Sequence, residues 1–120
     1  MVRDHPIAHC GVSEVAWLAG LLEGEAYFGA PIGGRSVRPC LRVQLHMTDE
    51  DVVRRAAALM DCKNVVPRGP YGTLSKQVQF WAVVYGARAE AVMRAILPYM
   101  GERRSAKIQE LLTLPNLSHL

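Results

Sequence analysis

Apolar residues recur at three- and four-residue spacing in four parts of this chain, which predicts four helices. Serine and threonine are good helix caps, glycine and proline end helices, and acids in a first turn complement the helix dipole. These signals place the helices at residues 15–22 (capped by Ser13 and ended at Gly24), after Thr48 with acids at 49–51, between Gly86 and Pro98, and at about 102–112.

Strict alternation of apolar and polar residues predicts two hairpins. The first joins strands at residues 27–32 and 38–47 around a turn at 31–36, and the second joins strands at 63–68 and 75–85 across 69–72. Hairpins alternating with helices predict an α+β fold in the order αββαββα. We expect a four-stranded antiparallel sheet with the helices on one face and the other face open.

The composition is that of an ordinary globular protein, and 120 residues suffice for one domain, 1–120. The net charge of +3 and the pI of about 9.0 favour a polyanionic partner. The cysteines Cys10, Cys40 and Cys62 fit neither a disulfide framework nor a zinc ribbon. With no signal peptide or membrane span in the pattern, we expect an intracellular protein of the cytoplasm, nucleoid or an organelle, with an N-terminal arm at 1–11 and a loose tail within 113–120.

The open face of the predicted sheet is rich in arginine and glutamine and has no acid at its expected positions. In the second strand Arg42, Gln44 and His46 alternate with apolar residues. Arginine can donate two bonds to guanine and glutamine can pair with adenine, so this face suits reading of the DNA major groove. Any solvated sheet face is polar, however, and alternation alone fits that reading equally well. The positions expected to contact DNA are Tyr27, Arg35, Arg38, Arg42, Gln44, His46, Arg68, Ser75, Gln77, Gln79 and Trp81.

The first helix has a stripe of small residues, Ala16, Gly20 and Gly24, at four-residue intervals. Glycine inside a helix costs about 1 kcal/mol relative to alanine, so Gly20 indicates a place where another backbone comes close. That backbone belongs either to another helix of the same chain or to a second copy of this helix.

The segment at residues 17–28, WLAGLLEGEAYF, resembles the signature of the LAGLIDADG homing endonucleases. Further similar segments are residues 48–51 and residues 97–100 before Arg103 and Arg104, and the element order is also that of the family. The resemblance implies a homodimer that packs two motif helices together and cuts double-stranded DNA at a palindromic or nearly palindromic site. A chain with one motif needs a second copy to complete the enzyme. We expect no small-molecule substrate.

The resemblance also assigns roles at the end of the motif. Glu25 matches the acid that binds the catalytic Mg²⁺, the carbonyl of Gly24 is a further expected ligand, and Mn²⁺ or Ca²⁺ can replace Mg²⁺ in binding. Glu23 is expected to cap or pair instead. Ala26 stands where the family usually has glycine, which puts activity in doubt.

Two further catalytic roles have candidates. A residue that orders the attacking water is expected among Gln44, His46 and Met47, and Arg103 is expected to stabilise charge on the phosphate. His46 can equally be a DNA-contact or surface histidine. The residues expected at the dimer interface are Ala16, Ala19, Gly20, Leu21 and Gly24.

Two alternatives remain open at this point. One is a catalytically inactive DNA- or RNA-binding protein on the same fold, such as a regulator or a maturase. The other is a small dimeric interaction protein that binds no nucleic acid. His5, His9 and Cys10 lack a fourth partner and make a poor zinc site, so we expect an ordinary N-terminal arm there.

Overall fold

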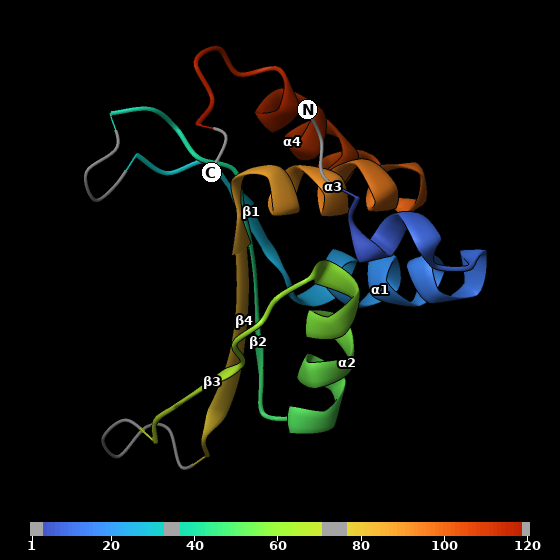
Figure 1. Ribbon diagram of the computed structural model, residues 1–120, viewed down its shortest axis with the longest axis vertical. Coiled ribbons are helices and arrows are strands. Elements are labelled where there is room, and N and C mark those ends of the chain that lie inside the picture. The colour runs from blue at the N-terminus through green and yellow to red at the C-terminus, as the bar shows by residue number, and fades with distance from the viewer. Residues whose placement is uncertain (1–3, 33–36, 71–76, 119–120) are drawn as a thin grey trace.

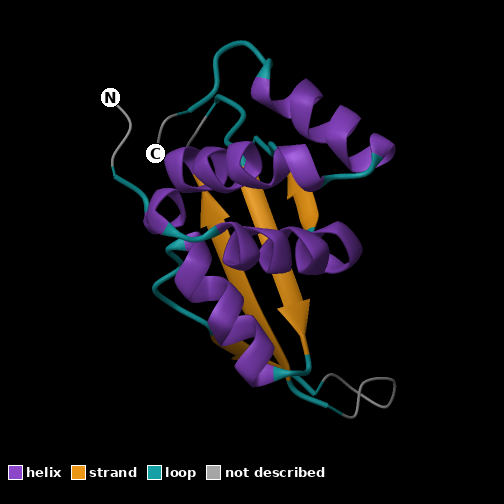
Figure 2. Cartoon of the chain, turned by 90° about the vertical axis from the view of Figure 1, so that its right-hand side faces the viewer, coloured by secondary structure: helices purple, strands orange, loops and turns teal. Residues whose placement is uncertain are grey.

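The computed structural model describes residues 4–32, 37–70 and 77–118. Its four helices lie on one side of the four-stranded sheet, as Figures 1 and 2 show, which confirms the predicted α+β class. The helices are α1 (Val12–Glu25), α2 (Glu50–Met60), α3 (Gly86–Ile96) and α4 (Glu102–Leu112), with single 3₁₀ turns η1 (Pro6–His9) and η2 (Leu97–Tyr99). No described helix is long and apolar enough to cross a membrane.

The strands are β1 (Tyr27–Gly29), β2 (Arg42–Met47), β3 (Val66–Arg68) and β4 (Gln79–Tyr85). They form an antiparallel sheet in the order β1-β2-β4-β3, so the two long strands are central and the two short ones are edges. This order follows from two hairpins whose second arms lie side by side, and it puts the middle of β2 and β4 at the centre of the open face.

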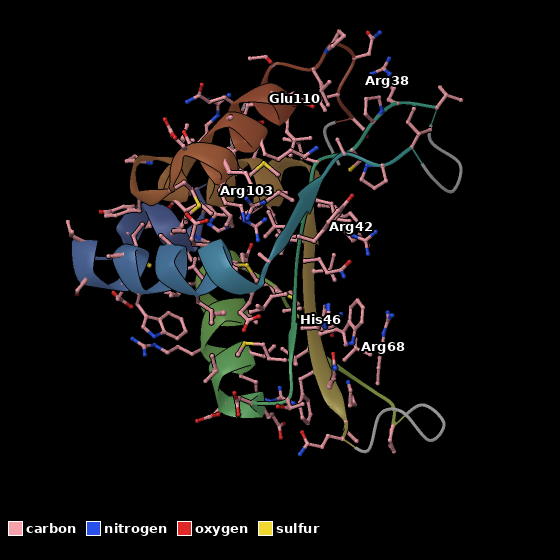
Figure 3. All side chains as sticks on the ribbon, turned by 180° about the vertical axis from the view of Figure 1, so that it is seen from behind. Arg38, Arg42, His46, Arg68, Arg103 and Glu110 are labelled. Atoms are coloured by element: carbon pink, nitrogen blue, oxygen red, sulfur yellow. The ribbon has the colours of Figure 1, made fainter. Side chains whose placement is uncertain are left out.

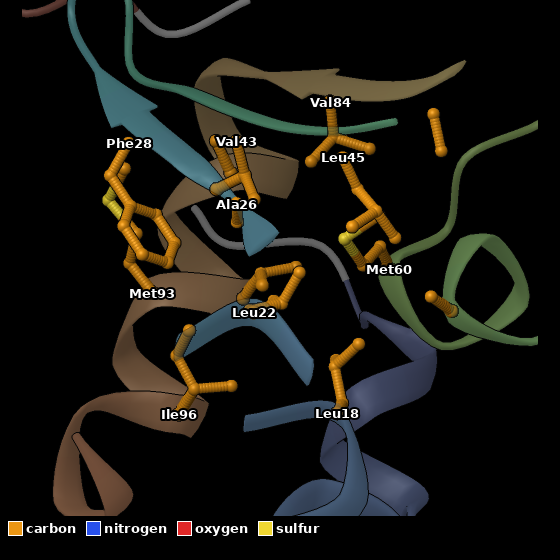
Figure 4. Close-up of a cluster of buried hydrophobic side chains, with 14 of the residues drawn as sticks. Leu18, Leu22, Ala26, Phe28, Val43, Leu45, Met60, Val84, Met93 and Ile96 are labelled. Atoms are coloured by element: carbon orange, nitrogen blue, oxygen red, sulfur yellow. The ribbon is translucent and has the colours of Figure 1, made fainter. Parts of the chain in front are cut away.

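The core lies between the sheet and the helices (Figure 4). Leu41, just before β2, and Val43 and Leu45 within it are buried in the same core cluster as Leu22 of α1, as period-two alternation requires. Each helix contributes its apolar stripe; the fully buried side chains include Leu18, Leu22, Val53, Met60, Val92, Met93, Ile96 and Ile108.

The strands of the first hairpin are shorter than the sequence predicted. The ladder runs only between Gly29 and Arg42, whereas the alternation extended to residues 32 and 38. Pro31 and Pro39 have no N–H and cannot continue the ladder. The arms still touch beyond it, because the amide of Cys40 donates to the carbonyl of Pro31 at 3.2 Å.

The second hairpin is shortened in the same way. β3 covers only Val66–Arg68, although the predicted strand began at residue 63, and β4 begins at Gln79; residues 75–76 of the predicted fourth strand lie outside the described part, and residues 77–78 are not in the strand. Pro67 within β3 is compatible with its position at the sheet edge, where one side of the strand needs no partner.

The predicted caps of the first two helices are wrong. α1 is capped at Gly11, whose amide donates to the Glu14 carboxylate at 3.4 Å, and Ser13 lies inside the helix. The apolar pattern begins at Val15, about one turn after the helix itself begins at Val12. The first turn of α1 is exposed, with Val12 at 74%, and contributes no buried residue to the pattern. α2 is capped at Asp49, one residue after Thr48.

The N-terminal segment is part of the core, contrary to our expectation of a plain arm. Ile7 is buried in the hydrophobic cluster, and His5 is 7% exposed. The amide of Ile7 donates to His5 Nδ1 at 3.1 Å, so Nε2 carries the proton and donates to the carbonyl of Met60 at 3.0 Å. His5 therefore fastens the start of the chain to the end of α2.

The C-terminal segment is also better anchored than expected. Leu114 and Leu117 pack against the core, and the amide of Ser118 donates to the carbonyl of Pro39 at 2.8 Å. The prediction of a loose tail is therefore wrong for residues 113–118, and residues 119–120 lie outside the described part.

Candidate nucleic-acid interface and metal site

Side chains of the open sheet face form rows across the strands, because residues paired across a ladder project on the same side. Pairings of β2 and β4 continue onto β1 and β3. None of the described residues in these rows is acidic. The rows are Gly29, Arg42 and Tyr85; Tyr27, Gln44 and Val83; His46, Trp81 and Val66; and Gln79 with Arg68.

Trp81 is the hub of this face. Its indole stacks on the imidazole of His46, with ring centroids 4.2 Å apart and planes 13° apart. The guanidinium of Arg68 lies over the same indole at 4.5 Å from the ring centroid. His46 Nδ1 is 2.7 Å from Gln79 Oε1, a contact in which the imidazole donates. Figure 3 shows His46 and Arg68 projecting away from the helices.

Arg42 is held in a similar way at the other end of the face. Its Nη2 donates to Gln44 Oε1 at 2.6 Å, and its guanidinium lies 5.5 Å from the centroid of the Tyr85 ring. The guanidinium groups of Arg42 and Arg68 are thus ordered on aromatic rings in the free protein. This ordering lowers the conformational entropy that the two side chains lose when they bind a ligand.

Several residues predicted to contact DNA lie beyond the ladder. Arg38 is exposed in the segment before β2, and Gln77 is exposed two residues before β4. Arg35 and Ser75 lie outside the described residues. Conversely, Val66, Val83 and Tyr85 belong to the face without having been predicted there, although Val83 and Tyr85 share the alternation of Gln79 and Trp81 in β4.

The small-residue stripe of α1 faces outward. A Cβ built on Gly20 or Gly24 meets no atom within 4 Å, so no part of the described chain requires glycine at either position. Ala16 is half-buried. This excludes packing against a described helix of the same chain as the reason for the glycines.

Two other residues of the expected dimer interface need correction or qualification. Ala19 is only 1% exposed and belongs to the chain's own core, so it cannot lie on the outward stripe. Ala19 lies with Leu18 on the side of α1 that faces the core, and residue spacing alone did not show which side that is. Leu21 is half-buried and packs at the edge of that core.

The acids of the motif have different surroundings at the end of α1. Glu23 Oε1 accepts a hydrogen bond from the amide of Gly101 at 2.7 Å, as expected for a capping residue. Glu25, the last helical residue, is exposed, and none of the described residues pairs with its carboxylate. Gly24 lies in the same last turn, whose carbonyls have no partner further along the helix.

Ala26 fits its position without strain. Its φ of −90° and ψ of 155° are ordinary extended values that any residue adopts, and its side chain is 6% exposed in the core. The Cβ of Ala26 is therefore a core contact and does not distort the backbone after Glu25.

A basic hollow of about 510 Å³ lies beside the segment that follows Glu25. Arg103 and Lys107, one turn apart on α4, line it together with Tyr27 and Glu110. Arg103 is exposed there, close in space to the end of the motif helix, whereas its neighbour Arg104 is bonded to the carbonyls of Glu23 and Ala26. The sequence could not distinguish these two arginines.

The candidates for ordering water differ in environment. Met47 packs against the core and is a poor water ligand. Gln44 pairs across the ladder with Tyr27, and His46 lies further along β2, toward the residues that precede Tyr27. Gln44 therefore lies opposite the first residue of β1, and His46 lies beyond it in the direction of the end of α1.

Within residues 4–32, 37–70 and 77–118, no three His, Cys, Asp or Glu side chains gather closely enough to hold a metal. His5 is used by the core, and His9 pairs with Asp4 at 2.8 Å. Among the described residues at the tip of α1, Glu23 is bonded to Gly101, and Glu25 is left as the unpaired hard oxygen donor. That donor fits Mg²⁺ only where water, phosphate oxygens or another subunit complete the coordination shell.

The four helices on one face of a four-stranded antiparallel sheet give this chain the fold of the LAGLIDADG homing endonucleases. One similar solved structure is the homing endonuclease I-CvuI in complex with its target in the presence of 2 mM Ca; its TM-score is 0.59 and its identity 16%, over 84% of this chain and 69% of that chain. Another is I-CvuI in complex with the I-CreI target in the presence of 2 mM Mg, with the DNA not cleaved. Its TM-score is 0.61 and its sequence identity is 20%, and the match covers 87% of this chain and 69% of that chain.

No family model and no curated protein matches the sequence. At the identity of these two structures, the likeness establishes the fold.

Proposed function

We propose that this chain is a Mg²⁺-dependent, site-specific endonuclease that cuts double-stranded DNA as a homodimer. The observation that carries the proposal is the unpaired Glu25 carboxylate at the tip of a helix whose outward side is a stripe of small residues. A second copy seated on Ala16, Gly20 and Gly24 brings two Glu25 carboxylates together.

The chemistry follows from these groups. Phosphodiester hydrolysis needs an activated water and a stabilised phosphate, and a divalent ion supplies both when it is bound. Glu25 and the Gly24 carbonyl would hold the ion, with DNA oxygens and water as the other ligands. Arg103 stabilises negative charge on the phosphate, and arginine stays charged at any working pH. Gln44 or His46 orders the water.

The open sheet face is the proposed DNA-reading surface. Its arginines and glutamines offer paired donors and acceptors to base edges, and two-fold symmetry presents the same face to each half-site. I-CvuI, whose fold this chain shares, is described in complex with DNA targets. A palindromic or nearly palindromic target is therefore expected.

A catalytically inactive DNA- or RNA-binding protein is the second candidate. Met47 favours it, because this apolar, half-buried residue occupies one of the positions where a polar, water-ordering residue is expected. Such a protein keeps the reading face and loses the cutting.

Selection from a randomised duplex library tests these proposals. Duplexes that bind are isolated in Ca²⁺ and then incubated with Mg²⁺, and cut ends are sequenced. Cutting at one site supports the endonuclease, and binding without cutting supports the second candidate. If no duplex binds even at low salt, where phosphate contacts are strongest, the endonuclease and the DNA-binding form of the second candidate are both wrong, and the interaction-protein alternative gains.

A further inference from the structure

The end of α1 and the start of α4 are joined by a reciprocal set of hydrogen bonds. The carboxylate of Glu23 accepts from the amide of Gly101, which is the N-cap residue of α4. In return, Arg104 Nε donates to the carbonyl of Glu23 at 3.1 Å and Arg104 Nη2 donates to the carbonyl of Ala26 at 2.8 Å. We call Glu23, Gly101 and Arg104 the α1–α4 clasp.

The two carbonyls bound by Arg104 lie on either side of Gly24 and Glu25 in the sequence. The last carbonyls of a helix have no partner within it, and a nearby cation also offsets the negative end of the helix dipole. A planar guanidinium can hold two acceptors at a fixed separation, which an ammonium cannot do. Arg104 therefore fixes the backbone from which the Glu25 carboxylate projects.

The surroundings of Arg104 hold its guanidinium in one place. Its side chain is 15% exposed, its Nε lies 3.7 Å from Glu23 Oε2, and its guanidinium lies 5.2 Å from the centroid of the Phe28 ring. Phe28 itself is 2% exposed in the core. The Arg104 side of the clasp is thus anchored to the packed interior and largely shielded from the solvent that weakens surface ion pairs, whereas the Glu23 side chain is 36% exposed.

The clasp also sets the position of Arg103. Consecutive residues on a helix point about 100° apart, so with Arg104 turned to α1, Arg103 is left exposed in the hollow beside Tyr27. The α1–α4 clasp therefore fixes the end of α1, which carries Glu25, relative to the first turn of α4, which carries Arg103.

We infer that Arg104 is a positioning residue, which holds Glu25 and Arg103 in register so that one metal and one phosphate can be bound together. This inference rests on the proposed endonuclease function. Arg104 touches neither metal nor DNA in this role; it acts through the backbone of Glu23 and Ala26.

The test compares Arg104→Met and Arg104→Lys with Arg94→Met and the unsubstituted chain. Arg94 is a matched control, because it is an exposed helical arginine paired with Glu90 at 2.8 Å, on α3. The Mg²⁺ concentration for half-maximal cutting of the selected duplex is measured below the unfolding temperature of each variant. Duplex affinity is measured in Ca²⁺.

A second readout needs no cutting. Mn²⁺ is titrated into each protein bound to the selected duplex, and paramagnetic broadening of the Gly24 and Glu25 amide signals reports metal binding at the α1 tip. Both readouts are taken on protein shown by circular dichroism to be folded, so that a loss of stability alone changes neither midpoint.

Loss of a group that orients a metal ligand typically weakens metal binding or activity by 10- to 100-fold, so we expect Arg104→Met to raise both metal midpoints by about tenfold or more. Duplex affinity in Ca²⁺ should stay close to that of the unsubstituted chain. The metal midpoints of Arg104→Lys should lie between those of Arg104→Met and the unsubstituted chain, because lysine keeps the charge but lacks the planar guanidinium. Those of Arg94→Met should equal those of the unsubstituted chain.

Unchanged midpoints in folded Arg104→Met would overturn the inference and leave the proposed function standing. If the unsubstituted chain neither cuts a selected duplex nor shows Mn²⁺ broadening at Glu25, the proposed function is wrong, and the inference that depends on it is overturned with it.

Discussion

The imidazole of His46 stacks on the indole of Trp81 with a centroid separation of 4.2 Å, on the open sheet face. Arg68 covers the same indole and Gln79 accepts from the imidazole. One aromatic side chain therefore orders two groups of the proposed DNA-reading surface before DNA arrives.

Replacing Trp81 by alanine should lower duplex affinity about tenfold, because an aromatic contact and a cation–π contact of about 0.5–1 kcal/mol each no longer pre-order His46 and Arg68. Fluorescence anisotropy of a labelled selected duplex at fixed salt measures the change. Tyr99→Ala is the control, since Tyr99 is 44% exposed on the helix side in η2. Equal affinities of the two variants would remove Trp81 from the reading surface.

Replacing Gly20 by leucine should produce a folded monomer. Gly20 is exposed, a Cβ added there meets no atom of the described chain within 4 Å, and leucine favours helix over glycine, but the larger side chain would occupy the space that a second α1 needs. Analytical ultracentrifugation gives the mass, and circular dichroism confirms folding. Ala58→Leu, on an exposed position of α2, should remain dimeric. A Gly20→Leu dimer, or a monomeric unsubstituted chain, would place the glycine stripe outside any interface.

Replacing His5 by alanine should lower the unfolding free energy by about 1–3 kcal/mol. The buried imidazole bonds the amide of Ile7 and the carbonyl of Met60, and its removal leaves both groups unpaired. Urea unfolding followed by circular dichroism measures the loss. His9→Ala should change stability by less than about 0.5 kcal/mol, because the His9 and Asp4 side chains are 69% and 79% exposed. A harmless His5→Ala would show that the N-terminal segment adds nothing to the fold.

Asp61 should make stability depend on pH. Hydrogen bonds from Lys63 and Arg88 hold the pKa of the Asp61 carboxyl below its ordinary value of 3.8. A depressed pKa in the folded state means that the ionised form stabilises the fold above pH 3.8, and that this contribution is lost as the pH falls through the lowered pKa. Asp61→Asn should thus cost about 0.5–1 kcal/mol at pH 7 and almost nothing at the acid end.

Urea unfolding of Asp61→Asn and the unsubstituted chain across this pH range provides the measurement. Asparagine tolerates the left-handed conformation of position 61, where φ is 61°, so backbone strain does not confuse the comparison. A stability difference that stays constant from pH 7 to below 3 would rule out the ion pairs as its cause.

The layer order and the last two helices could be predicted from the sequence because their signals are local. Gly86 begins α3 with a φ of 59° that glycine adopts freely, and Pro98 prevents its continuation. The ends of the strands could not be predicted well, because alternation continues past Pro31 and Pro39 although hydrogen bonding does not. The burial of His5 depends on the carbonyl of Met60, which lies far away in the sequence.

In the candidate site too, local features could be predicted and those that depend on contacts between elements could not. Periodicity assigned Arg42, Gln44 and His46 to one face, and the ladder confirms that they share it. Which of two adjacent arginines is tied to α1 and which is exposed depends on how α4 docks, and no pattern within α4 encodes that. The direction of Ala19 relative to Gly20 likewise depended on which side of α1 meets the sheet.

Glu25→Gln tests the central claim most directly. The selected duplex is incubated with the unsubstituted chain or with the variant, in Mg²⁺ for cutting and in Ca²⁺ for binding. The proposed metal site predicts that both proteins bind with affinities within about threefold of each other, because the change removes a metal ligand and no base contact, and that only the unsubstituted chain cuts. Cutting by Glu25→Gln at the normal rate would contradict the claim.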